Sequence, residues 1–530
     1  MQQESIPFYK TGYFSSLICD YLDKKSDLRP FYNRFPNLKN FKKQLKEKEL
    51  FFSEEARSIL VKTLKSQYVN FETSEITNQN IESLNLTNTY TVTTGHQLNL
   101  FTGPLYFLYK IVSTINLCKE LKIKYPKYNY VPIYWMATED HDFEEINYFN
   151  FKGKKVQWNK EVSGAVGELS TEGLEAVFNL FSQDLGQTKN AEYLKNIFKK
   201  TYLEHDNLTD ATRFLANELF DDYGLVIIDA NEADLKRLFI PFVEEELFNQ
   251  SSFKAVSRTN ELLDDSYNIQ VNPREINLFY LKDKLRERIV FEESVYKVLN
   301  TDIIFSKSEI KKVLSEHPER FSPNVIMRPL YQEVILPNLC YIGGGGELAY
   351  WFQLKQFFDD AKVPFPILLL RNSVLIQTES QQKKLQKLNI SNQNLFLKRD
   401  AFINNKVREI SNIDIDFSPQ KELLLNQFKD LYKLAEQTDK SFLGAVKAQE
   451  VKQLKGLENL EKRLLKAQKK KLSDHVSRMI EIQNALFPNE SLQERNTNFS
   501  EFYLEFGVTL IEHLIENLDP LKSEFLVLTI

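Results

Sequence analysis

Four short apolar runs, separated by helical patterns, constrain the fold more than any other feature of the chain. They span residues 90–94, 130–137, 225–228 and 366–370, and helical patterns cover 104–121, 211–220, 232–248 and 347–358. The second run is apolar on both faces, as expected for a parallel strand covered by helices on each side. This alternation predicts a doubly wound α/β layer. About 90 residues separate the second and third runs and about 140 separate the third and fourth, so both gaps must hold insertions.

The pattern changes near residue 418. Leucines at steps of three and four predict two long helices, and the polar segment 438–442 joins them. Pro488 ends the second helix. We therefore predict three parts. Residues 1–417 form an α/β core with N-terminal helices and with insertions at about 151–210 and 250–325. Residues 418–488 form an antiparallel α-helical coiled-coil arm, and residues 489–530 form a segment that returns to the core. Residues 440–475 carry ten Lys and Arg against four Asp and Glu, which fits either a solvated flank or a phosphate-facing surface.

Composition narrows the class of protein. The 530 residues include 68 basic and 73 acidic side chains, a net charge of −5, which argues against a protein that coats nucleic acid. No apolar run approaches the roughly 20 residues of a membrane helix. Cys19, Cys118 and Cys340 lie far apart and form neither a disulfide framework nor a CxxC pair. We expect a soluble, cytoplasmic protein that binds neither nucleic acid nor membranes.

Glycine is scarce, yet four of the 16 glycines form one row, Gly343 to Gly346. Such a row lets backbone amides approach a phosphate closely, or it simply forms a tight turn before a helix. Residues 344–349 also match the dinucleotide pattern G-x-G-x-x-A, whereas the Lys-Ser or Lys-Thr of a Walker A loop is missing. An NADP-linked oxidoreductase therefore stays open as an alternative.

Polar residues follow the first two apolar runs. Thr94-Gly95-His96-Gln97 and then Gly103-Pro104 precede a helix, whose free amides favour an anion, although His96 and Gln97 can also simply cap backbone groups. Glu139, Asp140, His141 and Asp142 follow the second run. This cluster can take a proton from an amine or hold a divalent metal, or it is a hydrated acidic loop.

The second insertion is rich in arginine. Arg274, Arg286 and Arg288 can grip carboxylate or phosphate groups in bidentate fashion, or they pair with surface glutamates. Cys340 lies in an apolar stretch typical of a buried structural thiol, and no G-x-S-x-G elbow is present. Neither cysteine-nucleophile nor serine-hydrolase chemistry is indicated.

Together these segments resemble the cysteine-adding enzymes of bacillithiol biosynthesis, the cysteine ligases of that pathway. The resemblance spans nearly the whole chain and rests on residues 94–97 and 101–106, 135–143, 273–277, 341–351 and 492–495. It implies a Rossmann-like core with two inserted connective segments, similar to the core of class I aminoacyl-tRNA synthetases. It also implies addition of L-cysteine to the amino group of glucosaminyl-malate, binding of an adenine nucleotide (ATP or ADP), and a homodimer formed through the coiled coil. Many members have Gln at the position of His96 and Pro at that of Gly345.

From this resemblance and the residue types we assign roles, leaving metal dependence open and giving no residue to a metal. The catalytic candidates are Asp140, His141, Asp142 and His96. The substrate-binding candidates are Thr94, Gln97, Gly103, Glu139, Arg274, Asn277, Arg286, Arg288 and Glu347. The nucleotide-binding candidates are Gly343, Gly344, Gly346, Arg371, Ser373 and Arg495. A non-catalytic coiled-coil scaffold with an inert α/β head is the other alternative.

Overall fold

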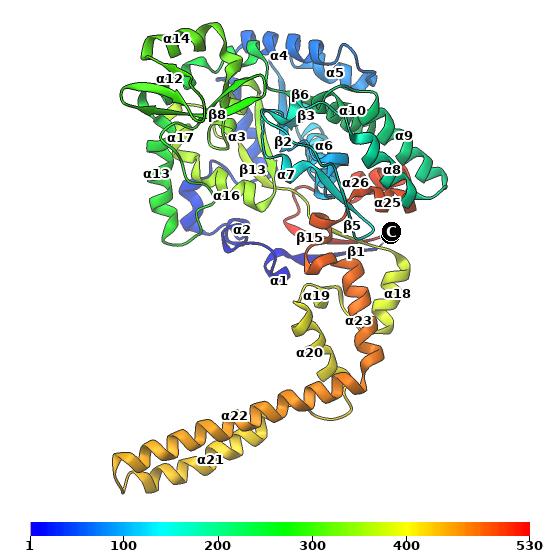
Figure 1. The fold of residues 1–530 in the computed structure, drawn as a ribbon, viewed down its shortest axis with the longest axis vertical. Helices are drawn as coiled ribbons and strands as arrows, with labels where there is room; N and C mark the ends of the chain where they lie inside the picture. The colour runs from blue at the N-terminus through cyan, green and yellow to red at the C-terminus, as the bar shows by residue number, and fades with distance from the viewer. Residues whose placement is uncertain (1) are drawn as a thin grey trace. The chain divides into compact units, whose positions relative to one another are not determined.

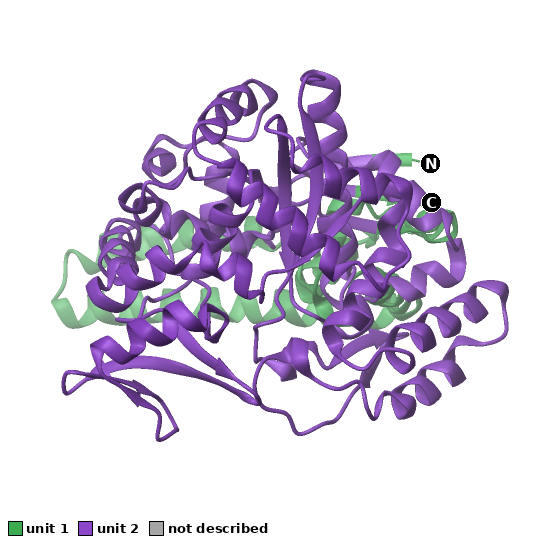
Figure 2. Cartoon of the chain, turned by 90° about the horizontal axis from the view of Figure 1, so that it is seen from above, with its two compact units in different colours: residues 1–3, 376–492, 527–530 green, residues 4–375, 493–526 purple. Residues whose placement is uncertain are grey.

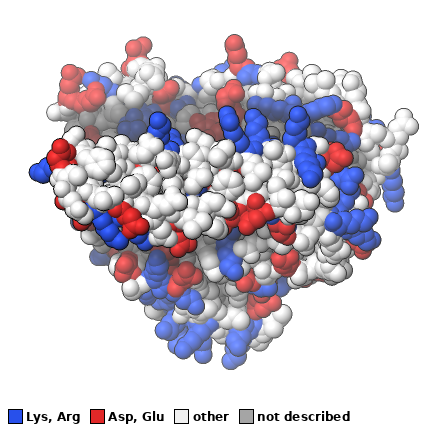
Figure 3. All heavy atoms as spheres, turned by 90° about the horizontal axis from the view of Figure 1, so that it is seen from below, with Lys and Arg blue, Asp and Glu red and all other residues white. Residues whose placement is uncertain are grey.

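The computed structural model describes residues 2–530, which form two compact units (Figure 2). The larger unit comprises Glu4–Leu375 and Gln493–Leu526, and the smaller is built mainly from Ile376–Leu492. No helix within residues 2–530 has the length and apolar character needed to cross a membrane. Acidic and basic side chains are interspersed over the face of the molecule that Figure 3 presents.

A five-stranded parallel sheet forms the centre of the larger unit (Figure 1). Its order is β13-β12-β2-β3-β6. The strands are β2 (Thr89–His96), β3 (Asn129–Met136), β6 (Val226–Asp229), β12 (Asn338–Gly343) and β13 (Ile367–Leu370). When the strands are numbered in chain order, the sheet has the order 3-2-1-4-5, which is the Rossmann arrangement. All strands are parallel, and the order in which successive strands are added changes side between β2 and β12. The predicted doubly wound α/β class is confirmed.

Strand β12 is the one strand of this parallel sheet that was not predicted from the sequence. The stretch before the glycine row was interpreted only as the surroundings of a buried thiol, and the run at 366–370 was counted as the fourth strand. In the structure β12 is completely buried and pairs with both β2 and β13, with an irregularity in register between Asn338 and Cys340. Pro337 directly before the strand and Asn338 within it weakened the strand pattern.

Helices flank the sheet, and two of the predicted helices are interrupted. The helix expected at 232–248 is divided into α11 and α12, with Pro241 in the first turn of the second, and that at 347–358 is divided at Leu354 into α16 and α17. The bounds of the helices in this layer are α3 (Leu38–Glu49), α4 (Glu54–Gln67), α5 (Glu75–Ser83), α6 (Tyr106–Lys124), α10 (Leu208–Phe220), α11 (Ala233–Arg237), α12 (Ile240–Asn249), α15 (Met327–Ile335), α16 (Gly345–Gln353) and α17 (Lys355–Ala361).

Two segments are inserted between the parallel strands. The first follows β3 and holds α7 (Phe143–Ile146), the hairpin β4 (Tyr148–Phe151) and β5 (Lys154–Gln157), α8 (Leu174–Leu185) and α9 (Lys189–Leu203). The second follows α13 (Ser251–Asp264) and holds α14 (Lys307–Glu316) and an antiparallel sheet of order β10-β9-β8-β7-β11. These strands are β7 (Leu278–Lys282), β8 (Leu285–Glu292), β9 (Val295–Val298), β10 (Ile304–Phe305) and β11 (Phe321–Pro323).

The smaller unit contains the predicted helical arm. Helices α21 (Ser418–Ala435) and α22 (Lys440–Lys471) lie side by side and are joined by a short turn, as Figure 1 shows. Helix α23 (Ser473–Leu486) continues from α22 and ends two residues before Pro488. The antiparallel coiled-coil prediction is confirmed. Near the C-terminus of the chain lie α24 (Gln493–Asn496), α25 (Phe499–Phe506), α26 (Thr509–Asn517) and the closing strand β15 (Glu524–Thr529).

Candidate functional site

The carboxyl ends of β12, β2 and β3 bring the glycine row and the acidic cluster to one edge of the sheet. Ile342 pairs with Thr94, and Thr94 pairs with Tyr134, so these three residues form one row across the strands. Neighbouring strands lie about 4.8 Å apart, so the next residues on β12 and β3, Gly343 and Trp135, are separated by about 10 Å. This edge includes the point where strand order reverses, which is where α/β sheets of this type bind ligands.

The glycine row forms the start of helix α16, and a carboxylate of the chain itself occupies it. Glu347 accepts hydrogen bonds from the Gly344 N–H at 2.8 Å and the Tyr341 hydroxyl at 2.6 Å. The Lys110 ammonium lies 2.7 Å from the same carboxylate. Burial alone would raise the pKa of Glu347, but the neighbouring ammonium and these hydrogen bonds lower it. A β-carbon at Gly343 would lie only 2.9 Å from the Tyr341 ring, so this position requires glycine.

Arg371, directly after β13, reaches the same loop. Its guanidinium pairs with Glu494 at 2.8 Å and donates to the Ser373 hydroxyl at 3.1 Å. Its Nε is buried and has no hydrogen-bond partner in the described part of the chain, and it lies 3.7 Å from where a β-carbon of Gly344 would stand. Glu494 and Ser373 thus hold Arg371 in place, while one donor remains open beside the glycine row.

The acidic cluster is compact and carries its own counter-charge. The Asp140 carboxylate accepts hydrogen bonds from the His141 N–H at 2.8 Å and from the Gln97 side-chain amide at 3.0 Å. The nearest ligand atoms of Asp140, His141 and Asp142 lie within 4.8 Å of one another, a spacing that a cation could bridge. Arg286 from β8 bonds to Nδ1 of His141, so a guanidinium already neutralises part of the cluster.

Arg286 comes from the second insertion, whose sheet supplies it to this edge. Its guanidinium lies 3.9 Å from the centre of the Phe279 ring and 3.4 Å from the Ser322 hydroxyl. Burial lowers the pKa of Arg286, but a guanidinium keeps its charge in proteins. Arg288 lies two residues further along β8, and alternate residues of a strand share one face.

A cavity of about 320 Å³ lies beside this edge. Gln97 lines it and donates to both Asp140 and Glu145, so the cavity adjoins the acidic cluster. Tyr106 also lines it, and the Arg371 guanidinium, which reaches the glycine loop, lies 5.0 Å from the centre of the Tyr106 ring. The residues around the cavity are Gln97, Asn99, Pro104, Tyr106, Glu145, Tyr148, Phe149, Asn150, Arg495 and Asn496.

Sequence analysis gave no role to several residues of this edge: Asn99, Tyr106, Lys110 and Glu145. Asn99 and Tyr106 lie within or beside the motif at 94–106, and Lys110 follows Tyr106 by one helical turn. Glu145 lies three residues after Asp142. Their closeness in sequence to the motifs was therefore the feature that could have indicated these residues as site residues. Spacing alone, however, does not show which side chains face a cavity.

Other candidates are engaged in packing. Thr94 is fully buried and donates to the carbonyl of Ile342 on the neighbouring strand. Glu139 forms an ion pair with buried Lys236. Asn277 is 1% exposed and lies in a separate polar cluster with Glu246 and Ser252, while Arg274 beside it is exposed. Gly103 has φ +63°, and a β-carbon there would lie 2.7 Å from Cβ of Asn99, so its role is conformational.

His96 is buried against the rings of Tyr106 and Phe107. Burial lowers its pKa from 6.5 to about 3, with the Lys110 ammonium acting in the same direction. The imidazole is therefore neutral at physiological pH and is a weak proton acceptor.

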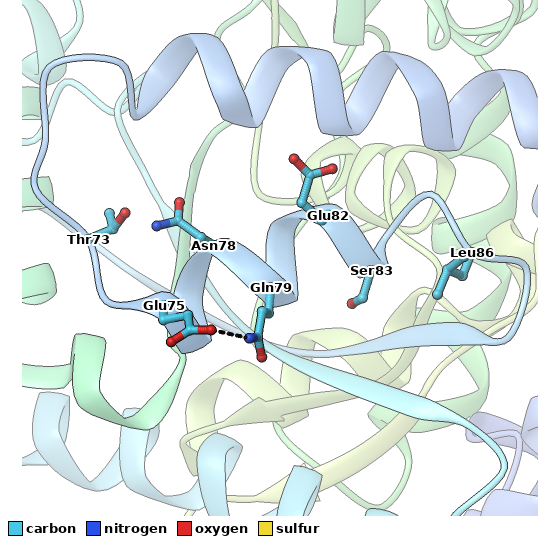
Figure 4. A pocket seen from close by; sticks show the side chains of 7 residues that line it. All are labelled: Thr73, Glu75, Asn78, Gln79, Glu82, Ser83 and Leu86. Carbon is cyan, nitrogen blue, oxygen red and sulfur yellow. Dashed lines mark hydrogen bonds between the residues drawn. The ribbon is translucent and has the colours of Figure 1, made fainter.

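A second hollow, of about 740 Å³, lies along α5 (Figure 4). Its lining includes Glu75 and Gln79, which bond to each other at 2.9 Å. Asn80 on the same helix donates to the carbonyl of Gly224, two residues before β6 begins. This hollow therefore lies toward the amino ends of the strands, away from the edge where such sheets bind ligands.

Two family models match the chain. The model described as "Bacillithiol biosynthesis BshC, N-terminal Rossmann-like domain" matches residues 1–372, and the model of the C-terminal coiled-coil domain matches residues 374–530. Relatives named "Putative cysteine ligase BshC" include those of Flavobacterium johnsoniae, with 63% identity over the whole of both chains, and Christiangramia forsetii, with 60% identity over 100% of this chain and 99% of the relative. The relative of Cytophaga hutchinsonii is 38% identical over 98% of this chain and 97% of its own.

Among solved structures, methionyl-tRNA synthetase of Mycobacterium tuberculosis in complex with methionyl-adenylate aligns with 81% of this chain and 91% of its own. The identity is 10% and the TM-score is 0.21, a likeness too low to support any argument about fold or function.

Proposed function

This chain belongs to the BshC family of bacillithiol biosynthesis, and from that premise we propose that it is an amide-forming ligase. Its substrates are L-cysteine and the amino group of glucosaminyl-malate, and the product is bacillithiol. An adenine nucleotide, ATP or ADP, supplies the activation that a carboxylate needs before an amine can displace oxygen from it. Adenylate and acyl phosphate both satisfy this requirement. The names of the relatives support the ligase class, and the sheet edge supports the chemistry.

The observation that carries the proposal is the position of the cavity between Gln97, which holds Asp140, and Tyr106, which stacks on Arg371. A carboxyl group bound there has Tyr106, backed by Arg371, on one side and Gln97, which holds Asp140, on the other. The amine nitrogen attacks the activated carbonyl carbon, a C–N bond forms, and the C–O bond to the activating group breaks. Holding both reactants at this edge converts a bimolecular encounter into an oriented step.

Asp140 is our candidate for the group that accepts the amine proton. The hydrogen bonds from the Gln97 side-chain amide and from the His141 N–H fix the orientation of its carboxylate. His141 and Asp142 then orient the amine. Arg286 and Arg288 share one face of β8, and in this proposal they hold the malate carboxylates.

The experiment is direct reconstitution. Purified protein is incubated with glucosaminyl-malate, L-cysteine and ATP or ADP, and bacillithiol is followed by mass spectrometry. We expect product with the wild type and a rate lower by about 10² or more in Asp140→Asn, the usual range for loss of a general base. Glu144→Gln, which neutralises an exposed carboxylate four residues away, is the matched control and should retain the rate. Absence of product with either nucleotide, or an unimpaired Asp140→Asn enzyme, refutes the proposal.

The proposed dimer uses the arm. Leu423, Leu431 and Leu434 on α21 are 66%, 39% and 55% exposed. At about 100° per residue they fall within one arc of about 80° on the helix. An apolar stripe of this kind is typical of a coiled-coil contact, and we assign it to a second copy of the chain.

A further inference from the structure

The cavity at the sheet edge contains two opposite charges that do not meet. Glu145 accepts a hydrogen bond from the Gln97 amide at 2.9 Å, but it forms no ion pair with any residue in 2–530. Arg495, on α24, forms neither an ion pair nor a hydrogen bond with a described residue. Two other charged groups next to the cavity wall are paired: Lys110 with Glu347, and Arg371 with Glu494. An unpaired anion and an unpaired cation lining one cavity are complementary to a zwitterion.

A third polar group at the cavity also lacks its partner. Asn99 is 9% exposed, and its Oδ1 is buried without a donor among the residues that the structure describes. Its Nδ2 donates to the backbone carbonyl of Glu145 at 3.2 Å, which fixes the orientation of the amide. A buried acceptor without a donor destabilises the site, so the position favours a ligand that brings an N–H donor.

The remaining walls set the size and character of the ligand. Tyr106, Tyr148 and Phe149 contribute aromatic surface, which suits a short apolar or sulfur-containing side chain. The volume of about 320 Å³ lies at the lower end of small-molecule sites. It admits a molecule of amino-acid size together with water.

We propose that this cavity is the subsite for a small zwitterionic α-amino acid. Its carboxylate pairs with Arg495, and its ammonium group pairs with Glu145 and donates to Oδ1 of Asn99. The identification of that amino acid as L-cysteine rests on the proposed function. In this arrangement the ammonium is bound by Glu145 and is kept from acting as a competing nucleophile. The carboxyl group lies on the side of Tyr106, whose ring stacks on Arg371 beside the glycine loop.

The test measures binding of L-cysteine to the full-length protein by isothermal titration calorimetry. We expect the dissociation constant to rise at least tenfold in both Glu145→Gln and Arg495→Gln. It should stay within twofold of wild type in the controls Glu144→Gln and Arg237→Gln, which alter exposed charges that do not line the cavity. Thermal unfolding of each variant verifies that it is folded. No cysteine binding by the wild type, with or without ATP, overturns the subsite, and so does an effect confined to one of the two cavity variants.

Two fragments of the ligand show which charge each residue binds. Cysteamine lacks the carboxylate and 3-mercaptopropionate lacks the amine, and each is used as a competitor of L-cysteine. Glu145→Gln should weaken competition by cysteamine only, and Arg495→Gln that by 3-mercaptopropionate only. The reverse pattern overturns the assignment, as does an Arg495→Gln variant that loses affinity for ATP while keeping that for cysteine.

Failure of this subsite and failure of the ligase proposal give different results. If the wild type makes bacillithiol but both cavity variants keep the wild-type KM for cysteine, the ligase stands and the subsite is refuted. If cysteine binds with the predicted variant pattern but glucosaminyl-malate is never converted, the subsite stands and the ligase is refuted.

Discussion

The sheet of the larger unit and the arm of the smaller unit bury their apolar side chains to different extents. Around the sheet, residues such as Val92, Leu339 and Ile342 are 0% exposed and form one continuous core. In the arm, the cluster between α21 and α22 consists of Phe428, Ala435 and Val446 with Leu424 and Tyr432 at its margin. Large residues elsewhere on these two helices stay exposed, among them Leu434 at 55%, Val451 at 57% and Leu460 at 53%.

The difference shows where each region obtains its stability. A buried core stabilises the folded state in proportion to the apolar area removed from water. The two helices of the arm contact each other along one narrow strip, so they remove little apolar area from water. Their remaining apolar side chains stay exposed and are available to contact another molecule. We therefore expect substitutions in the larger unit to change its free energy of unfolding, and substitutions on the exposed face of the arm to change association instead.

The largest effect is expected at a buried ion pair of the larger unit. Lys48 on α3 lies 2.9 Å from Glu333 on α15, and both side chains are 0% exposed. Burial raises the pKa of Glu333, while Lys48 and Asn338 act in the opposite direction. Lys48→Met leaves the carboxylate without its cation, and breaking a buried pair in this way costs about 3–5 kcal/mol. Urea unfolding measures the loss, and Lys46→Met on the exposed side of α3 is the matched control.

A double variant separates charge from packing at this position. In Lys48→Met with Glu333→Gln no carboxylate remains unpaired, and the amide oxygen at position 333 still accepts from Gln332 and Asn338, so we expect most of the lost free energy of unfolding to return. A double variant as unstable as the single one would show that the side-chain volumes, rather than the charges, cause the destabilisation.

A smaller effect, dependent on pH, is expected at His96. In the unfolded chain the imidazole binds a proton below about pH 6.5, whereas in the folded chain burial holds its pKa at about 3. The unfolded state therefore gains protons first, and stability falls as pH falls from about 6.5 toward 3, by at most about 1.4 kcal/mol per pH unit from this group. His96→Gln removes this contribution, so its free energy of unfolding should decline less steeply between pH 6 and 4.

The control for this measurement is His475→Gln, which changes an exposed imidazole on α23. Its stability profile should follow that of the wild type. If His96→Gln follows it too, the imidazole is protonated in the folded state and the buried, neutral description of His96 is wrong.

The parts of the fold that the sequence predicted are those with local patterns. The runs at 90–94 and 130–137 and the leucine stripes of the arm show periodicity within a single element, which depends only on which face is buried. The predicted strands in turn give the positions of the motif at 94–106 and of the cluster at 139–142, because each segment directly follows one of these runs. Parallel strand ends share one edge, so strand positions were enough to bring these segments together.

The parts that were missed depend on pairing between distant segments. The position of β12 inside the sheet follows from its contacts with β2 and β13, and its own sequence follows Pro337 and begins with Asn338. Glu145 and Arg495 are 350 residues apart, and only the folded chain shows that they line one cavity. The Glu347 carboxylate on the Gly344 amide was likewise not predicted, because the glycine row alone favours an external anion.

The smallest effect on unfolding, and the largest on association, is expected on α21. Leu423→Glu with Leu434→Glu places two charges on the exposed stripe, where the side chains are 66% and 55% exposed in the single chain. The free energy of unfolding should change by no more than about 0.5 kcal/mol, as is usual for exposed positions, while the proposed dimer should dissociate in sedimentation velocity. Leu425→Glu, on the opposite side of the same helix and 39% exposed, is the control and should leave the dimer intact. A wild-type protein that sediments as a monomer, or a double variant that still dimerises, would show that the stripe is not the contact between copies.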